Sequence, residues 1–291
     1  MSYSKYMIIT GGTSGIGLEA ARTLSFDPEL HITVTGRTDP GSLPENVEFV
    51  ACDLADLEAV LAFCASWTRP LSALVLNAGV MKVDLTHVGE VETTFAINHV
   101  GNTALFFGIK EHLLPDARVI IVSSELHSSE VRAGPHWTTA AEVAAAKDPE
   151  MEGGMVRYAN SKLANMFFSN ALSRRAPEGW AVIAWTPGFV PAGGSKLARD
   201  RGLLATVGMP ILGAVLGILN MLGRTSASLS TVQRSGKALA DLVTEPEHKG
   251  EKGVYYQIEN KGESSAQSHN VALQDDLWDW TVRELGVDGT V

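Results

Sequence analysis

The stretch Thr10–Gly17, TGGTSGIG, decides the fold of this chain. Half of it is glycine, which costs backbone entropy and offers no side chain to pack, so such a run needs a structural reason. The apolar run Tyr6–Ile9 before it is typical of a strand, and the residues from Leu18 onward follow a helical spacing. A strand that turns through glycines into a helix brings bare backbone N–H groups and a helix N-terminus to one place, where a phosphate can bind.

Strand-like and helix-like segments alternate along the rest of the chain. Strands are predicted at Lys5–Thr10, His31–Gly36, Val47–Ala51, Ser72–Asn77, Arg118–Ser123, Trp180–Thr186 and Gly253–Gln257. Helices are predicted near Ile16–Ser25, Leu57–Trp67, Glu90–His112, Met155–Arg175, Ser226–Val243 and Asp275–Leu285. This order is typical of βαβ units and a parallel sheet covered on both faces.

We therefore predict an α/β, Rossmann-type doubly wound fold with a seven-stranded, mainly parallel sheet. One domain is expected over residues 1–291, with a cofactor-binding half in residues 1–125. The catalytic helix, a substrate lid and the C-terminal substrate part are expected in residues 126–291.

The composition is that of a globular protein with an ordinary core, since 45% of the residues are hydrophobic and 19% are charged. The net charge of −10, without a run of basic residues, argues against a nucleic-acid surface. Cys52 and Cys64 are too few for a disulfide framework or a metal cage, so no metal is expected. The first strand begins so close to Met1 that no signal peptide is expected, and a cytoplasmic location is predicted.

The glycine turn also fits the G-x-G-x-x-A pattern from Gly15 to Ala20. In its strand–turn–helix context, this pattern predicts the pyrophosphate of a dinucleotide on the helix N-terminus. The alternative is a turn that merely reverses the chain. The residues predicted to contact the cofactor here are Gly11, Thr13, Ser14, Gly15, Ile16 and Gly17.

The end of the second strand, Thr35–Thr38, is expected to meet the adenosine ribose. An acidic residue there would accept from the 2′-hydroxyl, but the sequence has Arg37, whose planar fork can pair with a phosphate. NADP(H) is therefore favoured over NAD(H). A shorter turn would bring Asp39 into place and reverse this preference, and Arg37 as a surface residue is the other alternative.

Tyr158 and Lys162 have the i and i+4 spacing that places two side chains on one face of a helix. A free tyrosine has a pKa near ~10, and a nearby cation lowers that value and makes proton exchange with a carbonyl or alcohol oxygen practicable. By itself such a spacing is common on helix surfaces.

Combined with other motifs in order, this pair resembles the short-chain dehydrogenase/reductase superfamily over essentially the full chain. The further motifs are Asn77-Ala78-Gly79, Asn98 in FAINHVGN, Ser123-Ser124 and Thr186-Pro187-Gly188. The resemblance implies that Tyr158 is the general acid/base and that Lys162 lowers its pKa and holds the nicotinamide ribose. It further implies that Ser124, or alternatively Ser123, binds the substrate oxygen and that Asn98 positions a water of a proton relay.

The same resemblance implies further cofactor contacts. Asp53 and Leu54 follow the third strand where relatives contact adenine, although Asp53 as a helix cap is an alternative. The residues Asn77, Ala78 and Gly79 are expected to form the cofactor floor. Pro187 and Gly188 are expected to pass the nicotinamide amide, with Val190 nearby.

One branch is indicated by YANSKLAN at Tyr158–Asn165 and by GVYYQ, SSAQSHN and LWDWTVREL near the C-terminus. These segments resemble the retinol dehydrogenase and protochlorophyllide reductase-like branch, as does the 34-residue gap from Ser124 to Tyr158 (158 − 124). The light-dependent photoenzymes have a cysteine where this chain has Ala164. Relatives also have a threonine after the Pro-Gly pair, where this chain offers residues 191–194, so the backbone or Ser195 would make that contact.

The segment Leu203–Leu222 holds twenty residues without a charge. We expect it to be the substrate lid, which favours a hydrophobic ketone, aldehyde or secondary alcohol. The alternatives are a membrane-surface or subunit contact and a membrane-spanning helix. His127, His136 and Trp137 either border the same pocket or lie on a loop surface, and we favour the loop surface.

These observations predict an NADP(H)-dependent carbonyl reductase or alcohol dehydrogenase. The alternatives are a protochlorophyllide reductase-like enzyme, a tailoring reductase of secondary metabolism, and an NADP-sensing regulator without turnover. A homodimer through the helices that bear Asn98 and Tyr158 is compatible with the apolar face of residues 160–171, and a monomer is the alternative.

Overall fold

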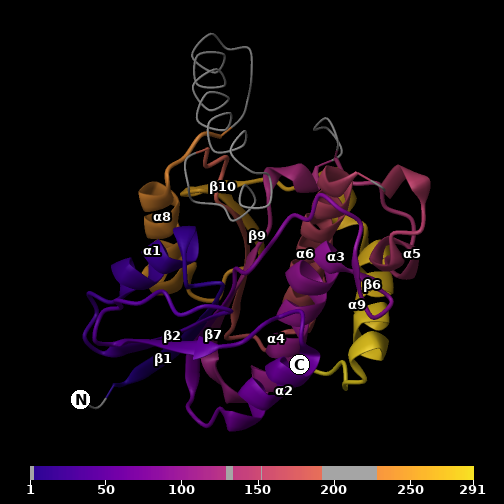
Figure 1. Ribbon diagram of the computed structural model, residues 1–291. Helices are drawn as coiled ribbons and strands as arrows, with labels where there is room; N and C mark the ends of the chain where they lie inside the picture. The colour runs from indigo at the N-terminus through magenta and orange to yellow at the C-terminus, as the bar shows by residue number, and fades with distance from the viewer. Residues whose placement is uncertain (1–2, 129–133, 152, 192–227) are drawn as a thin grey trace.

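One sheet runs through the protein in the computed structural model, which describes residues 3–128, 134–151, 153–191 and 228–291 (Figure 1). The strand order across this sheet is β10-β9-β8-β7-β4-β1-β2-β3. Its strands are β1 (Lys5–Thr10), β2 (Leu30–Gly36), β3 (Val47–Ala51), β4 (Leu71–Leu76), β7 (Leu113–Val122), β8 (Ala181–Thr186), β9 (Lys252–Gln257) and β10 (Asn260–Gly262). Neighbouring strands are parallel except for β10, which pairs with β9 in the antiparallel sense. The predicted doubly wound, mainly parallel fold is confirmed, with β10 as an added short edge strand.

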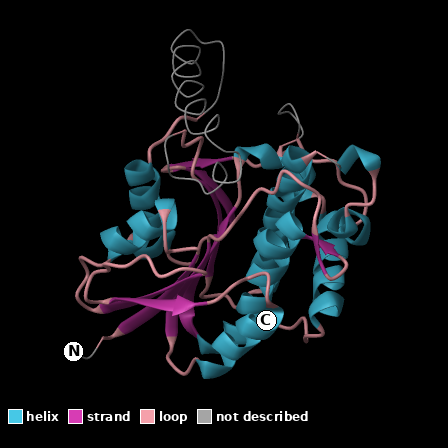
Figure 2. Ribbon diagram, in the orientation of Figure 1, coloured by secondary structure: helices cyan, strands magenta, loops and turns pink. Residues whose placement is uncertain are grey.

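Helices cover both faces of the sheet (Figure 2). On one face, α1 (Gly15–Leu24) and α8 (Val232–Thr244) lie side by side. The other face carries α2 (Leu57–Ser66), α4 (Asn102–Ile109) and α6 (Gly154–Arg175), and α9 (Val271–Leu285) packs on the outside of α6. The short helix α5 (Ala140–Ala145) packs against α9.

The central strands are apolar without interruption because both of their faces are buried. In β1, Ile8 points into the core beneath α2 and α4, whereas Met7 and Ile9 point into the core beneath α1 and α8. Alternation with a period of two along an apolar strand therefore supplies two hydrophobic cores at once.

The predicted single helix Glu90–His112 is wrong in detail. The segment begins with a hairpin of β5 (His87–Val88) and β6 (Val91–Glu92) and continues through α3 (Thr93–Phe95), a π-helical turn at Ala96–Gly101, α4, and a 3₁₀ turn at Lys110–His112. The amide of Asn102 donates to the carbonyls of Ile97 and Asn98, which are acceptors that a regular α-helix uses for its own N–H groups. A π-bulge of this kind often marks a functional site.

Capping residues shift the starts of two other predicted helices. Helix α8 begins at Val232 rather than near Ser226, because the Thr231 hydroxyl accepts from the Arg234 N–H at 3.1 Å. Helix α9 begins at Val271 rather than near Asp275, because the Asn270 side chain accepts from two N–H groups of the first turn. Both follow the usual N-cap chemistry of threonine and asparagine.

The lid segment Leu203–Leu222, residues 192–194 and Ser195 lie outside the described residues. Within the described ranges, no helix has both the length and the apolar character needed to cross a bilayer. The division of the chain into a cofactor-binding half and a substrate half stays a prediction.

Candidate active site

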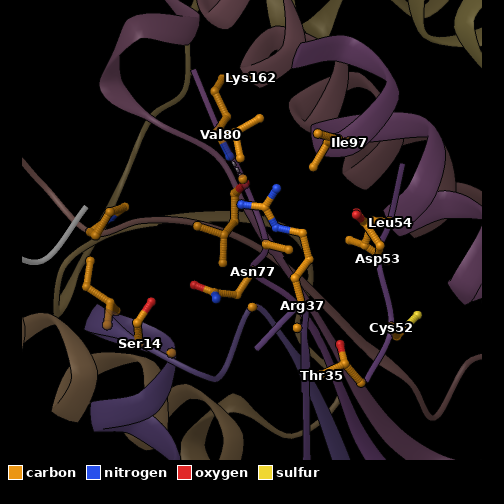
Figure 3. Close-up of a pocket in the computed structure, with 18 of the residues that line it drawn as sticks. Ser14, Thr35, Arg37, Cys52, Asp53, Leu54, Asn77, Val80, Ile97 and Lys162 are labelled. Atoms are coloured by element: carbon orange, nitrogen blue, oxygen red, sulfur yellow. Dashed lines mark hydrogen bonds between the residues drawn. The ribbon is translucent and has the colours of Figure 1, made fainter. Parts of the chain in front are cut away.

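A cleft lies at the carboxyl ends of β1 and β4, where the strand order reverses direction in the sheet. In doubly wound folds this switch point is where ligands bind. Figure 3 shows the side chains that line the cleft. The predicted residues among them are Gly11, Ser14, Ile16, Gly17, Arg37, Asp53, Leu54, Asn77, Ala78, Gly79, Tyr158, Lys162 and Pro187.

The glycine turn packs directly against the end of β4. A Cβ atom on Gly11, whose φ is +66°, would lie 2.8 Å from the Cα of Ala78, and one on Gly17 would lie 2.7 Å from the Asn77 side-chain nitrogen. Both distances are shorter than van der Waals contact, so these positions require glycine. Thr13 is buried beneath the cleft beside Gly36, and Gly15 begins α1.

The N-terminus of α1 opens into this cleft. Its N-cap residue, Ser14, lines the cleft and makes no side-chain hydrogen bond to the helix, and the first turn carries no acidic residue. The N–H groups of the first turn and the helix dipole therefore suit an anionic group such as a pyrophosphate.

Thr10 and Asn102 hold the floor of the cleft in place, and neither was predicted as a site residue. The Thr10 hydroxyl donates to Asn102 Oδ1 at 2.8 Å and accepts from the backbone N–H groups of Asn77 and Ala78 at 2.9 Å each. Asn102 in turn donates to the Ala78 carbonyl at 3.1 Å. The signal that could have found them is their place in the quoted motifs, since Thr10 opens TGGTSGIG and Asn102 ends FAINHVGN.

Arg37 lines the cleft directly after β2. Its side chain is exposed and reaches inward among the labelled residues of Figure 3. Among the described residues, no side chain or carbonyl forms a hydrogen bond or ion pair with the Arg37 guanidinium. Asp39, the alternative determinant, instead accepts from the N–H of Gly41 at 2.7 Å within its own loop.

Asp53 and Leu54 line the same end of the cleft. The carboxylate of Asp53 accepts from the Ala55 N–H at 3.1 Å, whereas α2 is capped by Asp56, whose side chain accepts from the Ala59 N–H. The alternative interpretation of Asp53 as the helix cap is therefore wrong.

Tyr158 and Lys162 line the other end of the cleft together with Ser123, while Ser124 lies beside Tyr158 and is not among the lining residues. The Lys162 ammonium lies 5.6 Å from the centroid of the Tyr158 ring and donates to the Val122 carbonyl at 3.0 Å. The Ser124 side chain lies close enough to the Tyr158 phenol to lower its pKa, against the effect of burial. The spacing of four residues on α6 does bring the phenol and the ammonium to one face, as predicted.

The two serines after β7 have different partners. The Ser123 hydroxyl is buried and donates to the Lys162 carbonyl at 2.8 Å, so it is engaged by the backbone of α6. The Ser124 oxygen accepts from the Leu126 N–H at 3.3 Å, and the hydroxyl lies near the Tyr158 phenol. This arrangement favours Ser124 over Ser123 as the residue that contacts a substrate.

The electrostatics of this group differ from the expectation. Burial raises the pKa of Tyr158 to about 12, while the Ser124 side chain acts in the opposite direction. Burial also lowers the pKa of Lys162 to about 8. The pKa of Tyr158 therefore lies above its usual value rather than below it, because the loss of hydration outweighs the effect of Ser124.

Asn98 lies in the π-helical turn, fully buried behind the cleft. Its side chain accepts from the Val80 N–H at 2.7 Å and donates to the Val80 carbonyl and the Ser161 hydroxyl at 2.9 Å each. Asn98 thus joins the strand end after β4 to α6. Its predicted role in placing a water stays a prediction.

The segment after β8 reaches the cleft at Pro187. The Pro187 carbonyl accepts from the Ser235 hydroxyl at 2.8 Å, which ties this segment to α8. Gly188 packs against the carbonyl of Ser228, and Val190 is buried beyond it. Neither Gly188 nor Val190 lines the cleft among the described residues.

Three residues between Ser124 and Tyr158, which were predicted to border the pocket or to lie on a loop surface, are not among the residues that line the cleft. His127 is only 3% exposed, so its interpretation as loop surface is wrong. His136 is half-buried between the carboxylates of Asp148 and Glu150, and the Trp137 ring packs edge-on against Phe167.

Comparison with known proteins agrees with this geometry. The family model described as short chain dehydrogenase matches residues 5–142. The chain is 28% identical to short-chain dehydrogenase TIC 32 B, chloroplastic, from Brassica napus, over 95% of this chain and 87% of that protein. It is 30% identical to a probable oxidoreductase of Streptomyces lividans over 63% of each chain.

A solved structure has the same fold. The short-chain dehydrogenase from Burkholderia cenocepacia, in complex with NADP, superposes with a TM-score of 0.62 at 20% identity, over 88% of this chain and 97% of that one. The motif order, the switch-point cleft and these likenesses agree with one another. The family model covers residues 5–142, and the relatives named above extend the likeness to short-chain dehydrogenases and other oxidoreductases over the rest of the chain.

Proposed function

We propose that this protein is an NADP(H)-dependent oxidoreductase that transfers a hydride between nicotinamide and a hydrophobic ketone, aldehyde or secondary alcohol. Tyr158 is the general acid/base in this proposal. The observation that carries it is the pairing of Tyr158 with Lys162 at one end of the cleft, which the glycine turn and Arg37 line at the other.

The residues present fit a dinucleotide. The glycine turn and the uncapped start of α1 would hold the pyrophosphate, Asp53 and Leu54 would lie at the adenine, and Lys162 would hold the nicotinamide ribose. When bound, the cofactor supplies or takes up the hydride.

Ser124 and Tyr158 would handle the proton. Ser124 would orient the substrate oxygen next to the phenol, and Tyr158 would give its proton to that oxygen in reduction or take one in oxidation. With a pKa of about 12, Tyr158 is protonated at neutral pH, which favours its service as an acid in carbonyl reduction. The Lys162 ammonium would stabilise the phenolate that this step leaves behind.

The preference for NADP(H) rests on Arg37. Its guanidinium lies at the adenosine end of the cleft without a partner among the described residues, whereas Asp39 is turned away into its own loop. A cation at this place can form a bidentate pair with a 2′-phosphate.

The apolar nature of the substrate rests on the sequence of Leu203–Leu222, which lies outside the described residues. The retinol dehydrogenase and protochlorophyllide reductase-like branch likewise stays a prediction, as does the cytoplasmic location.

A panel of apolar aldehydes and ketones tests the activity. Purified protein is mixed with NADPH and each carbonyl, and the absorbance of the reduced cofactor is followed. Consumption of NADPH with at least one carbonyl is expected. Tight NADPH binding without turnover on any member would contradict the proposed reaction and would favour a cofactor-sensing regulator.

Titration with NADPH and NADH tests the cofactor preference. The two dissociation constants are expected to differ at least ~10-fold, or ~1.4 kcal/mol, and Arg37→Ser should remove most of that difference. Arg22→Ser, which removes an exposed cation near the far end of α1, is the matched control and should leave the ratio unchanged. An equal preference in wild type and Arg37→Ser would contradict the assignment.

A further inference from the structure

His127 contacts the backbone of Ser124 from the end of the 3₁₀ turn Glu125–His127, which follows β7. Its Nδ1 lies 2.6 Å from the Ser124 carbonyl oxygen, and the His127 backbone N–H donates to the same oxygen at 3.0 Å. On the other side of the ring, the backbone N–H of Ser265 donates to Nε2 at 3.0 Å. The ring is 3% exposed and packs edge-on against Tyr255.

These two contacts fix the tautomer of His127. The Ser124 carbonyl can only accept a hydrogen bond, so Nδ1 must carry the proton. The Ser265 N–H can only donate, so Nε2 must be unprotonated. The ring is therefore neutral and bridges the Ser124 carbonyl and the Ser265 N–H, and Ser265 lies 138 residues beyond His127 in the chain. Burial lowers the pKa of His127 and keeps this neutral form at physiological pH.

Helix α6 anchors the far end of this bridge. The Ser268 carbonyl accepts from Asn170 of α6 at 2.9 Å and from Gln274 of α9 at 2.7 Å. The Ser268 hydroxyl donates to the Ser265 carbonyl at 2.6 Å. Ser265 is therefore held by Ser268, which is itself hydrogen-bonded to both α6 and α9. A chain of hydrogen bonds therefore leads from the helix that bears Tyr158, through Ser268 and Ser265, to the ring of His127.

We propose that His127 is a positioning residue that holds Ser124 at the Tyr158 phenol. Helix α6 places the phenol directly, and through His127 it also places the serine, so the distance between the two hydroxyl groups is set from one element. We call the two hydrogen bonds of the His127 ring, to Ser124 and to Ser265, the His127 clamp. Its anchored end is the SSAQSHN segment at Ser264–Asn270. The proposal rests on the proposed function, since it assigns His127 an effect on the rate of that reaction.

A pair of amide variants separates the two halves of the clamp. In His127→Asn the side-chain amide stands near the place of Nδ1 and can still donate to the Ser124 carbonyl, but it does not reach Ser265. In His127→Gln the amide reaches the place of Nε2 and can accept from Ser265, but it leaves the Ser124 carbonyl. Each variant loses one of the two hydrogen bonds, so each is the stability control for the other.

The rate and the binding constants are measured on both variants with the best carbonyl of the panel. We expect His127→Asn to keep a kcat close to wild type and His127→Gln to lose about 5- to 10-fold in kcat, the worth of one net hydrogen bond. KM and the NADPH dissociation constant should be unchanged in both. The proposal would be overturned if both variants lost kcat equally. It would also be overturned if the loss of kcat in each variant simply matched its loss of melting temperature.

A second readout does not depend on turnover. Nitrogen NMR of the histidine-labelled protein, with the His127 signals assigned by their loss in His127→Asn, is expected to show Nδ1 protonated and Nε2 bare. A ring protonated at Nε2 would overturn the clamp whatever the rates are. If the wild-type protein reduces no carbonyl, the proposed function is overturned together with the rate effect. If the wild type is active but His127→Asn and His127→Gln have the same kcat, only the role of His127 is overturned.

Discussion

The buried ion pair of Glu92 and Arg157 anchors the first turns of α6, because Arg157 directly precedes Tyr158 in this helix. Arg157 Nε donates to Glu92 Oε1 at 3.2 Å, and each side chain is 1% exposed. The other carboxylate oxygen accepts from the Phe95 N–H at 2.9 Å, where it caps α3. The guanidinium also donates to the Val83 carbonyl at 2.8 Å. One pair thus connects the helix that bears Tyr158 with the segment that leads to Asn98.

Arg157→Met is expected to destabilise the protein strongly. It leaves the Glu92 carboxylate buried without its cation, and breaking a buried pair in this way costs about 3–5 kcal/mol. That loss is a large share of the ~5–15 kcal/mol by which folded proteins are usually stable. The double variant Glu92→Gln/Arg157→Met removes the uncompensated charge and is expected to recover at least ~1 kcal/mol relative to the sum of the two single changes.

Urea unfolding followed by the fluorescence of the six tryptophans measures these differences. Lys237→Met is the matched control, since it breaks the exposed i,i+4 pair with Asp241 and should cost only about 0.3–0.5 kcal/mol. An Arg157→Met protein within ~1 kcal/mol of wild type, or a double variant as unstable as the sum of the singles, would refute the reasoning from buried charge.

Three further predictions concern the cleft and its surroundings. Gly17→Ala places a Cβ 2.7 Å from the Asn77 amide and should weaken NADPH binding at least ~10-fold in a fluorescence titration, whereas Gly262→Ala, whose nearest neighbour lies at 3.8 Å, should not. The rate of carbonyl reduction should be highest at neutral pH and should fall as the pH rises through about 8, because Lys162 loses its charge there. Lys162→Arg should move this fall to higher pH. If Lys162→Arg has the same pH profile as wild type, that result would count against the role of the ammonium. Light scattering should give the mass of one chain, since α9 covers the apolar face of α6 with Trp278 stacked on Phe168; a stable dimer would contradict this.

Local chemistry explains why much of the fold could be predicted. The glycine turn at Gly11–Gly17, the uninterrupted apolar strands and the four-residue spacing of Tyr158 and Lys162 depend on neighbours along the chain. Such signals survive in the sequence because turn conformation and side-chain direction are set within a few residues.

Features that depend on distant partners could not be predicted in the same way. The π-helical turn around Asn98 depends on the amide of Asn102, whose orientation is fixed by Thr10, 92 residues away. His127 is buried because its partner Ser265 comes from the far end of the chain. The raised pKa of Tyr158 likewise follows from packing around the phenol, which a spacing on one helix does not reveal.

The most direct test of the account is the turnover of Tyr158→Phe. The variant keeps the ring and its packing but has no proton to give, and general acid catalysis is worth about 10²–10⁴-fold in rate. We predict that NADPH-dependent reduction of the best ketone falls by that factor while the NADPH dissociation constant stays at the wild-type value. A Tyr158→Phe protein that reduces the ketone as fast as wild type would contradict the central claim that this phenol carries the proton.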